Sequence, residues 1–231
     1  MISKRYTHKL LHFFKLIAID IYNIIRYGKK FDLYGVSVFV GRQGAGKTIA
    51  MVDYLDRMAV KFPKCIIVTN FDYADSNLRM ESWEDIFNIR NGENGVIFAI
   101  DEIQNEYDST KWKEFLEGLL SEITMQRKQK IKIVATSQIF GRMVKQLREQ
   151  TFEVIECKTF FGRWTKLKAY DAWEYENCDG DRHKVSRLFK KWTWSFIQTN
   201  ELRQRYDTYE KIQAIAKVGF IPRDTRSREV V

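Results

Sequence analysis

Residues 41–48 read Gly41-Arg42-Gln43-Gly44-Ala45-Gly46-Lys47-Thr48, directly after the apolar run of residues 36–40 and before residues 49–54, which have the pattern of a helix. This order of strand, loop and helix is the context of a phosphate-binding P-loop. Its glycines let several backbone N–H groups turn inward, and the helix N-terminus adds partial positive charge. We expect all eight residues to bind ATP, with Lys47 reaching the β- and γ-phosphates and Thr48 offering its hydroxyl to Mg²⁺.

A second motif lies at the end of another apolar run. Residues 95–100 read Gly-Val-Ile-Phe-Ala-Ile and lead into Asp101 and Glu102. Acidic residues at the end of a buried strand, downstream of a P-loop, are typical of a Walker B motif. We expect Asp101 to hold Mg²⁺ together with Thr48, and Glu102 to act as the general base on the attacking water. The pair therefore predicts ATP hydrolysis and not nucleotide binding alone.

A third apolar run, residues 131–135, ends in the polar residues Thr136, Ser137 and Gln138. Polar side chains at the carboxyl end of a strand beside the P-loop strand face the γ-phosphate, so Gln138 is the candidate sensor. Arg127 precedes this strand and is the candidate arginine finger that reaches a neighbouring subunit's site.

The choice of Arg127 has alternatives. Arg142 and Arg148 are the reserve candidates for the finger, and a solvated basic turn at residues 125–130 explains Arg127 equally well.

These motifs predict an α/β fold, namely a P-loop NTPase with a parallel sheet. An additional strand, residues 64–70, falls between the P-loop and Walker B strands, and a β-hairpin around Gly162 extends the sheet. Helices are expected at residues 10–27, 114–127 and 202–217, in addition to the one after the P-loop.

Composition limits the classes of protein. The chain has 231 residues, 45% hydrophobic and 30% charged, with two prolines and no flexible linker, which favours one compact domain with extensions. The net charge of +9 divides into +5 for residues 1–35, −2 for 36–180 and +6 for 181–231. Basic ends favour a polyanionic partner, although solvated surface lysines explain them too. The three cysteines form no C-x-x-C pair, so a reducing, cytoplasmic location is expected and a cysteine zinc site is not.

Residues 10–27 have the pattern of an amphipathic helix. Lys15, Asp20 and Arg26 interrupt the apolar residues, so a membrane-spanning helix is not expected. At 100° per residue most polar side chains gather opposite a wide apolar face, with Leu16 and Ile19 on the polar side. The apolar face is expected to pack on the ATPase core or a neighbouring subunit; peripheral attachment to a membrane is the alternative.

The motifs together resemble those of the zonula-occludens-toxin-like ATPases, the assembly proteins of filamentous phages, within the HerA–FtsK group of DNA-pumping ATPases. Small genome-packaging ATPases of tailed phages are similar in the same motifs. The resemblance covers about residues 36–170. It is carried, in order, by Gly41 to Thr48, Val68-Thr69-Asn70, Ile100-Asp101-Glu102-Ile103-Gln104, Gln126-Arg127, Ser137-Gln138 and Leu147-Arg148.

The resemblance implies a motor that drives DNA through a ring of five or six copies, in contact with portal or assembly proteins. Filamentous-phage members usually continue into a membrane-spanning helix, whereas residues 171–231 are basic and contain no such span. This departure favours packaging or cytoplasmic translocation over membrane export. The chain is accordingly divided into residues 1–35, the ATPase domain 36–170 and the extension 171–231.

The extension contains Lys190-Lys-Trp-Thr-Trp-Ser-Phe, which interleaves basic and aromatic residues. Such a composition can hold phosphates and stack bases; a small helical cap with buried aromatics is the alternative. Two hypotheses follow. The first is an ATP-driven translocase of DNA, expected to be double-stranded, in phage genome packaging or virion morphogenesis. The second is a membrane-associated assembly or export ATPase. A GTPase is disfavoured because Asp101-Glu-Ile-Gln lacks the glycine expected after the magnesium aspartate, and because no N-K-x-D guanine motif occurs in the sequence.

Overall fold

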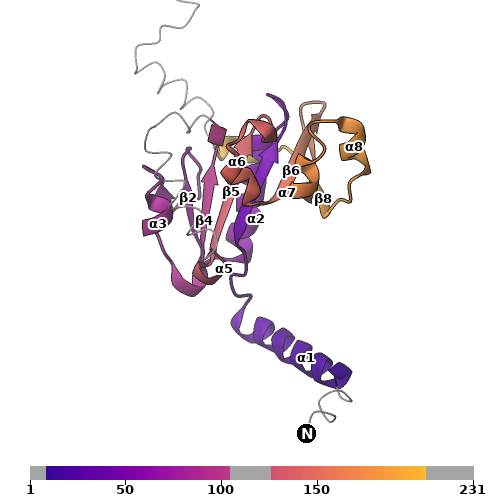
Figure 1. The fold of residues 1–231 in the computed structure, drawn as a ribbon. Helices are drawn as coiled ribbons and strands as arrows, with labels where there is room; N and C mark the ends of the chain where they lie inside the picture. Colours follow the sequence, from indigo (N-terminus) through magenta and orange to yellow (C-terminus); the bar gives the residue numbers. More distant parts are fainter. Residues whose placement is uncertain (1–8, 105–125, 207–231) are drawn as a thin grey trace, which may run out of the picture.

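The computed structural model describes residues 9–104 and 126–206. These residues form one eight-stranded sheet, in the order β3-β2-β4-β5-β1-β6-β7-β8, and a helix, α1, that stands away from it (Figure 1). The strands are β1 Gly35–Val40, β2 Ile66–Thr69, β3 Leu78–Arg79, β4 Val96–Ile100, β5 Ile131–Ser137, β6 Thr151–Phe160, β7 Trp164–Asp171 and β8 Trp192–Ile197. The α-helices are α1 Lys9–Tyr27, α2 Lys47–Lys61, α3 Asp85–Asn88, α5 Gln126–Gln129, α6 Lys145–Glu149, α7 Ala172–Glu176, α8 Arg182–Arg187 and α9 Asn200–Gln204.

The centre of the sheet is parallel, which confirms the predicted P-loop NTPase fold. β5 lies between β1 and β4 and pairs with both in parallel, so that Val40 faces Ser137 and Ile100 faces Ala135. Every residue of these three strands is buried, which is why their sequences are mostly apolar and do not alternate between apolar and polar residues. β2, the additional strand, follows β1 in the chain but lies on the far side of β4 in the sheet.

The other half of the sheet contains the predicted hairpin. β6 pairs with β1 in parallel, and β6 and β7 form an antiparallel hairpin whose turn holds Phe161 and Gly162 at positive φ. The sequence predicted this hairpin correctly. It also predicted a helical extension after it, and the short helices α7, α8 and α9 lie there.

Residues 192–197 form a strand, which corrects the interpretation of the aromatic tail as a helical cap. β8 pairs antiparallel with β7 along its whole length. Trp192 and Trp194 lie on one face of the strand, and their indole N–H groups donate hydrogen bonds to Glu153 at 2.9 Å and to Asp53 at 3.1 Å. The alternating pattern of aromatic and hydroxyl residues is a strand signal, which explains the difference.

Two of the predicted helices extend beyond the described residues. Of residues 114–127, only the last two are described, as the start of α5, and of 202–217 only the part that includes the end of α9. α1 matches the predicted amphipathic helix. Its described side chains are exposed and it projects from the sheet (Figure 1), so the predicted packing on this chain's core is wrong. No helix in the described parts of the chain is long and apolar enough to cross a membrane.

Lys132 is a buried lysine in the middle of the sheet. Only 6% of the residue is exposed, and its ammonium donates to the Ser37 hydroxyl at 2.5 Å, which in turn donates to Glu153 at 2.7 Å. Burial lowers the pKa of Lys132 from 10.5 to about 8, although the nearby Glu153 carboxylate partly opposes this shift. Keeping this lysine charged therefore costs stability at neutral pH.

The stability of the protein should respond to pH through this lysine. Between about pH 8 and 10.5 the unfolded chain binds more protons at Lys132 than the folded one, so this group makes the protein more stable as pH rises. We expect the free energy of unfolding of the wild type, relative to that of Lys132→Met, to rise by roughly 1 kcal/mol per pH unit in this window. Denaturant unfolding of both proteins at several pH values measures the difference, in which titrations that both proteins share cancel. A difference independent of pH would refute the assignment.

Candidate functional site

The P-loop lies at the carboxyl end of β1, where the chain turns into α2. Gly46 has φ +84°, and a Cβ atom there would lie 2.5 Å from the Thr159 hydroxyl, so only glycine fits without displacing its neighbour. Lys47 is the first residue of α2 and is only 6% exposed. The loop therefore offers a fifteen-residue helix N-terminus and a buried ammonium group, which together favour an anion such as a phosphate.

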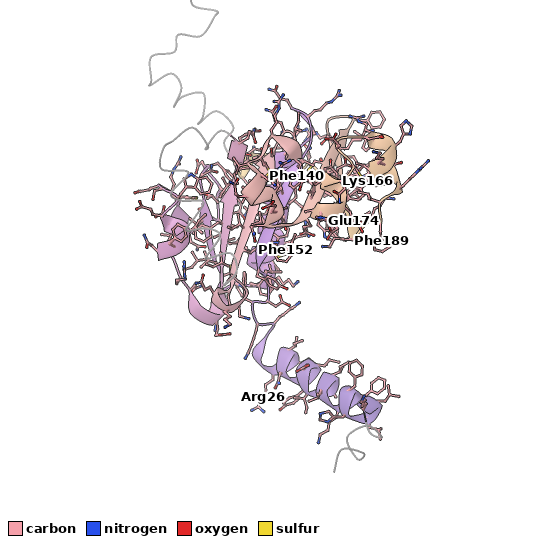
Figure 2. The ribbon with its side chains drawn as sticks, viewed as in Figure 1. Arg26, Phe140, Phe152, Lys166, Glu174 and Phe189 are labelled. Carbon is pink, nitrogen blue, oxygen red and sulfur yellow. The ribbon has the colours of Figure 1, made fainter. Side chains whose placement is uncertain are left out.

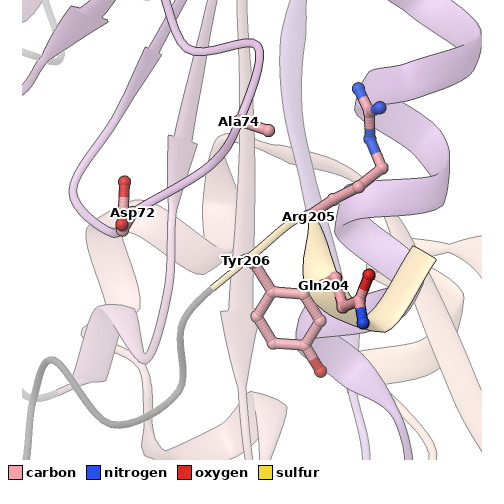
Figure 3. A pocket seen from close by; sticks show the side chains of 5 residues that line it. All are labelled: Asp72, Ala74, Gln204, Arg205 and Tyr206. Carbon is pink, nitrogen blue, oxygen red and sulfur yellow. The ribbon is translucent and has the colours of Figure 1, made fainter. Parts of the chain in front are cut away.

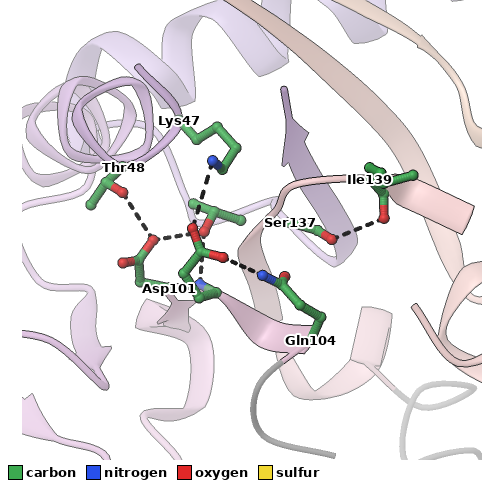
Figure 4. A network of polar contacts seen from close by, with 8 residues as sticks. Lys47, Thr48, Asp101, Gln104, Ser137 and Ile139 are labelled. Carbon is green, nitrogen blue, oxygen red and sulfur yellow. Dashed lines mark hydrogen bonds and ion pairs between the residues drawn. The ribbon is translucent and has the colours of Figure 1, made fainter. Parts of the chain in front are cut away.

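Asp101, at the end of β4, contacts both the P-loop helix α2 and the neighbouring strand β5 (Figure 4). Its carboxylate Oδ1 accepts hydrogen bonds from the Thr48 hydroxyl at 3.0 Å and from the Thr136 hydroxyl at 2.6 Å. The two groups predicted to hold Mg²⁺, Thr48 and Asp101, are thus in direct contact. Sequence reasoning did not single out Thr136, although it recognised the polar end of this strand.

The oxygen donors fit Mg²⁺. The Thr48 hydroxyl and the Asp101 carboxylate are the two oxygen donors in contact here. Mg²⁺ commonly binds through one or two protein oxygens and completes its octahedron with water and substrate phosphates. Thr48 and Asp101 would hold it in that way.

The side chain of Glu102 contacts Lys47 and Gln104. Its Oε1 lies 3.6 Å from the Lys47 ammonium nitrogen, and its Oε2 accepts a hydrogen bond from the Gln104 side-chain amide. The backbone of Glu102 has φ +53°, and its N–H donates to the Thr136 hydroxyl at 2.8 Å. This turn in the left-handed region separates the two acidic side chains, so that one is placed for Mg²⁺ and the other beside the expected phosphates.

Asn70 is a site residue for which the sequence analysis predicted no role. At the end of β2 its side-chain oxygen accepts from the Asp101 N–H at 2.7 Å, and its amide donates to the Asp101 carbonyl at 3.2 Å. The two bonds fix the backbone of Asp101 in place. The signal that could have identified it is its position, because a polar residue that ends a parallel strand beside a Walker B strand lies at the same edge.

The P-loop is also supported from the hairpin side by three polar residues, which we call the P-loop support: the half-buried Thr159 and the buried Thr165 and Gln198. The Thr159 hydroxyl donates to the Ala45 carbonyl at 2.9 Å and lies 2.9 Å from the Thr165 hydroxyl, to which the Gln198 amide donates at 2.8 Å. Arg163 and Arg203 hold Gln198 in turn. No local motif marks these residues, because strand pairing brings them together from distant parts of the chain.

Removing the Thr159 hydroxyl should weaken nucleotide binding. Thr159→Val keeps the shape but leaves the Ala45 carbonyl without its partner, at a cost of about 1 kcal/mol, which corresponds to roughly fivefold weaker binding if it falls on the loop. Thr193→Val, at an exposed threonine on β8, is the matched control. Titration with a fluorescent ATP analogue measures both. Equal affinities for the two variants would show that the support does not shape the loop.

The predicted sensor and arginine-finger residues make no described contact with Lys47, Thr48 or Glu102. Gln138 follows β5 and is exposed, and the described hydrogen bonds around Asp101 use Thr136 in its place, so the role of Gln138 as sensor stays a prediction. Arg127 lies in α5, but its side chain is outside the described residues. Of the reserve candidates, Arg148 forms an ion pair with Glu176 at 3.2 Å, and Arg142 is exposed.

The chain after β8 crosses α2 and returns toward this edge of the sheet. Tyr206 forms an antiparallel bridge with Tyr73, and Arg205 forms ion pairs with Asp56, at 3.0 Å, and with Asp75. A hollow of about 330 Å³ lies there, lined by Asp72, Ala74, Gln204, Arg205 and Tyr206 (Figure 3). Burial and the charge of Asp101 raise the pKa of Tyr206, so this segment lies within electrostatic reach of the Walker B carboxylate.

Comparison with known proteins identifies the fold. No family model and no curated protein matches the sequence. Among solved structures, the N-terminal domain of zonular occludens toxin from Neisseria meningitidis is similar at a TM-score of 0.51 and 18% identity, over 76% of this chain and 100% of that one. The genome packaging NTPase B204 from Sulfolobus turreted icosahedral virus 2, in complex with AMP, is matched at a TM-score of 0.41 and 13% identity, over 73% of this chain and 98% of that one. The chain therefore shares the fold of the zonular occludens toxin N-terminal domain, as its motifs indicated.

Proposed function

We propose that this chain is an ATPase that translocates DNA, in phage genome packaging or virion morphogenesis. The observation that carries the proposal is the convergence of Lys47, Thr48, Asp101 and Glu102 at one edge of the sheet, joined by the contacts described above. These are the groups that phosphoryl transfer to water requires. The similarity of fold to the zonular occludens toxin domain is consistent with it.

Each residue of the site has its own role in the proposed hydrolysis of ATP. The P-loop N–H groups and Lys47 bind and orient the phosphates of ATP, and Lys47 exchanges its contact with Glu102 for the γ-phosphate. Mg²⁺, held by Thr48 and Asp101, would neutralise phosphate charge. Glu102, released from Lys47, accepts a proton from the attacking water. Thr136 positions both residues, because its hydroxyl donates to the Asp101 carboxylate and accepts from the Glu102 N–H.

The finer parts of the proposal concern assembly. Five or six copies would form a ring around duplex DNA, with Arg127 of one copy completing the site of the next. Gln138 would sense the γ-phosphate from the end of β5. The basic charge of residues 181–231 supports a polyanionic partner.

Stimulation of ATP hydrolysis by duplex DNA tests the proposal. At low salt, where electrostatic binding is strongest, the purified full chain should hydrolyse ATP faster when DNA is added. The absence of any stimulation over a range of DNA concentrations would contradict DNA translocation while leaving ATP hydrolysis standing.

A specific observation favours a second function, that of a membrane-associated assembly ATPase. Along α1, apolar residues cover one continuous arc, and they are exposed: Leu10, Leu11, Phe13, Phe14, Ile17, Ile21, Ile24 and Ile25 are between 37% and 79% exposed. Basic side chains lie on the opposite face and in the segment after the helix, where Lys29 and Lys30 are exposed. An apolar face with basic flanks fits an anionic lipid surface.

Flotation of the full chain with vesicles that contain phosphatidylglycerol tests this attachment. Phe13→Asp with Ile17→Asp places two charges on the apolar arc and should abolish flotation. Leu16→Asp with Ile19→Asp makes the same change on the polar face of the same helix and should retain most of it. If neither pair changed flotation, or if the wild type did not float, the membrane function would be refuted.

A further inference from the structure

The two faces of the β6–β7 hairpin differ in chemistry. Cys157, Thr159, Thr165 and Leu167 point toward α2 and include two members of the P-loop support. Successive side chains of a strand point to opposite faces, so Lys158, Phe160, Trp164 and Lys166 share the other face. These four residues, with Lys168, are called here the outer hairpin face.

The outer hairpin face is basic and partly apolar. Lys158 lies directly opposite Lys166 in the strand register, and Phe160 lies opposite Trp164, with ring centroids 6.1 Å apart. The Lys158 ammonium lies 4.9 Å from the centre of the Phe160 ring. Lys158 and Lys166 are exposed, and 48% of Trp164 is exposed. Figure 2 marks Lys166 in this part of the sheet.

A shallow hollow follows this face. It has a volume of about 180 Å³ and is lined by Glu156, Lys158, Phe160, Lys166 and Lys168. Three of the five lining residues are lysines. Glu156 is the only acid among them, and it accepts a hydrogen bond from the Tyr175 hydroxyl at 3.1 Å. The hollow is thus positively charged along most of its length.

The pairing of two lysines works against the stability of the hairpin. Like charges that lie directly opposite each other on adjacent strands are destabilising. The acid of this face, Glu156, lies directly opposite Lys168, whereas Lys158 lies directly opposite Lys166. An anion bound between the two ammonium groups would remove the repulsion. The arrangement is therefore better suited to a bound anion than to the free surface.

A neighbouring helix adds charge of the same sign. Val185 of α8 packs with Tyr170 of β7, and Tyr170 lies on the same face of β7 as Lys166 and Lys168 because it is an even number of residues away. Arg182, Lys184 and Arg187 of this helix are exposed. Basic side chains therefore extend from the hairpin to α8. This surface is longer than the contact that a single small anion would make.

We propose that the outer hairpin face binds the phosphate backbone of DNA. Lys158, Lys166 and Lys168 would each neutralise a phosphate, and the two aromatic rings would pack against sugar or base edges. The inference rests on the proposed function, and adds to it where the DNA lies. It places DNA on the strands whose other face supports the P-loop, so the two ligands would share one structural element.

The test measures DNA affinity as a function of salt. A fluorescein-labelled duplex is titrated with the wild type, with Lys158→Gln plus Lys166→Gln, and with Lys61→Gln plus Lys64→Gln. The last pair removes the same charge from two exposed lysines outside the hairpin, at the end of α2 and in the connection before β2. For phosphate contacts, the slope of log K against log salt concentration should become shallower by about 1 for each lysine removed.

The expected result is a slope shallower by about 2 for the hairpin pair and unchanged for the control pair. The unfolding temperature of the hairpin pair should not fall, because the like-charge repulsion is relieved. Equal slopes for both pairs and the wild type would overturn the inference while leaving DNA binding intact. A wild type that does not bind the duplex at low salt would contradict the proposed function itself.

Discussion

Replacing Glu102 by glutamine is expected to reduce steady-state ATP hydrolysis by about 10²- to 10⁴-fold, the range that a positioned general base contributes. The amide has nearly the same size as the carboxylate but cannot accept a proton from water. ATP binding should be retained or strengthened, because Lys47 then has no carboxylate at 3.6 Å to compete with the γ-phosphate. Phosphate release and the binding of a fluorescent ATP analogue measure the two effects separately.

Glu149→Gln is the matched control for this change. Glu149 is an exposed glutamate whose partner is also a lysine, Lys145, at 3.7 Å. The control should hydrolyse ATP at the wild-type rate. Near-normal turnover by Glu102→Gln would remove Glu102 from the role of base, and loss of ATP binding would show that it acts in forming the pocket.

The second large effect is expected at Lys47. Lys47→Met removes the buried ammonium that pairs with Glu102 and leaves that carboxylate facing the phosphate site. The loss of charge-assisted hydrogen bonds to phosphate, at about 1.5–3 kcal/mol each, should weaken ATP binding by roughly 10- to 100-fold. The remaining negative charge of Glu102 should weaken it further.

Lys132→Met provides a stringent control, because Lys132 is equally buried but lies near the amino end of β5, at the other end of that strand from Thr136. It should leave ATP affinity unchanged. If both lysine variants lost affinity to the same extent, the effect would reflect damage to the sheet and not a contact with phosphate. If Lys47→Met bound ATP normally, residues 41–48 would not be a phosphate-binding loop.

Much of the candidate site was predictable because its residues are close together in the sequence. Asp101 and Glu102 are adjacent and directly follow the apolar run 96–100. Lys47 and Thr48 are adjacent as well, and the short loop 41–46 separates them from the apolar run 36–40. Thr136 was within the predicted sensor segment. Thr48 begins the helix that follows β1, and Asp101 directly follows β4. Their contact is expected because β1 and β4 are parallel strands of one sheet, and the carboxyl ends of such strands lie at the same edge.

The rest of the site could not be predicted because it depends on which strands are neighbours in the sheet. Thr159, Thr165 and Gln198 meet only because β6, β7 and β8 are neighbours, and β8 was not recognised as a strand. Both tryptophans of the tail that composition linked to nucleic acid donate hydrogen bonds within the chain, Trp192 to Glu153 and Trp194 to Asp53. The basic and aromatic surface lies on the preceding hairpin, where only strand register brings Lys158 opposite Lys166.

The most direct measurement of the central claim is the displacement of a labelled third strand from a DNA triplex. A motor that moves along duplex DNA displaces the third strand in an ATP-dependent reaction, with a delay that grows with the length of duplex before the triplex. We predict such a delay for the wild type and no displacement for Glu102→Gln. Displacement that did not require ATP, or a wild type that hydrolysed ATP on DNA without displacing the strand, would contradict DNA translocation.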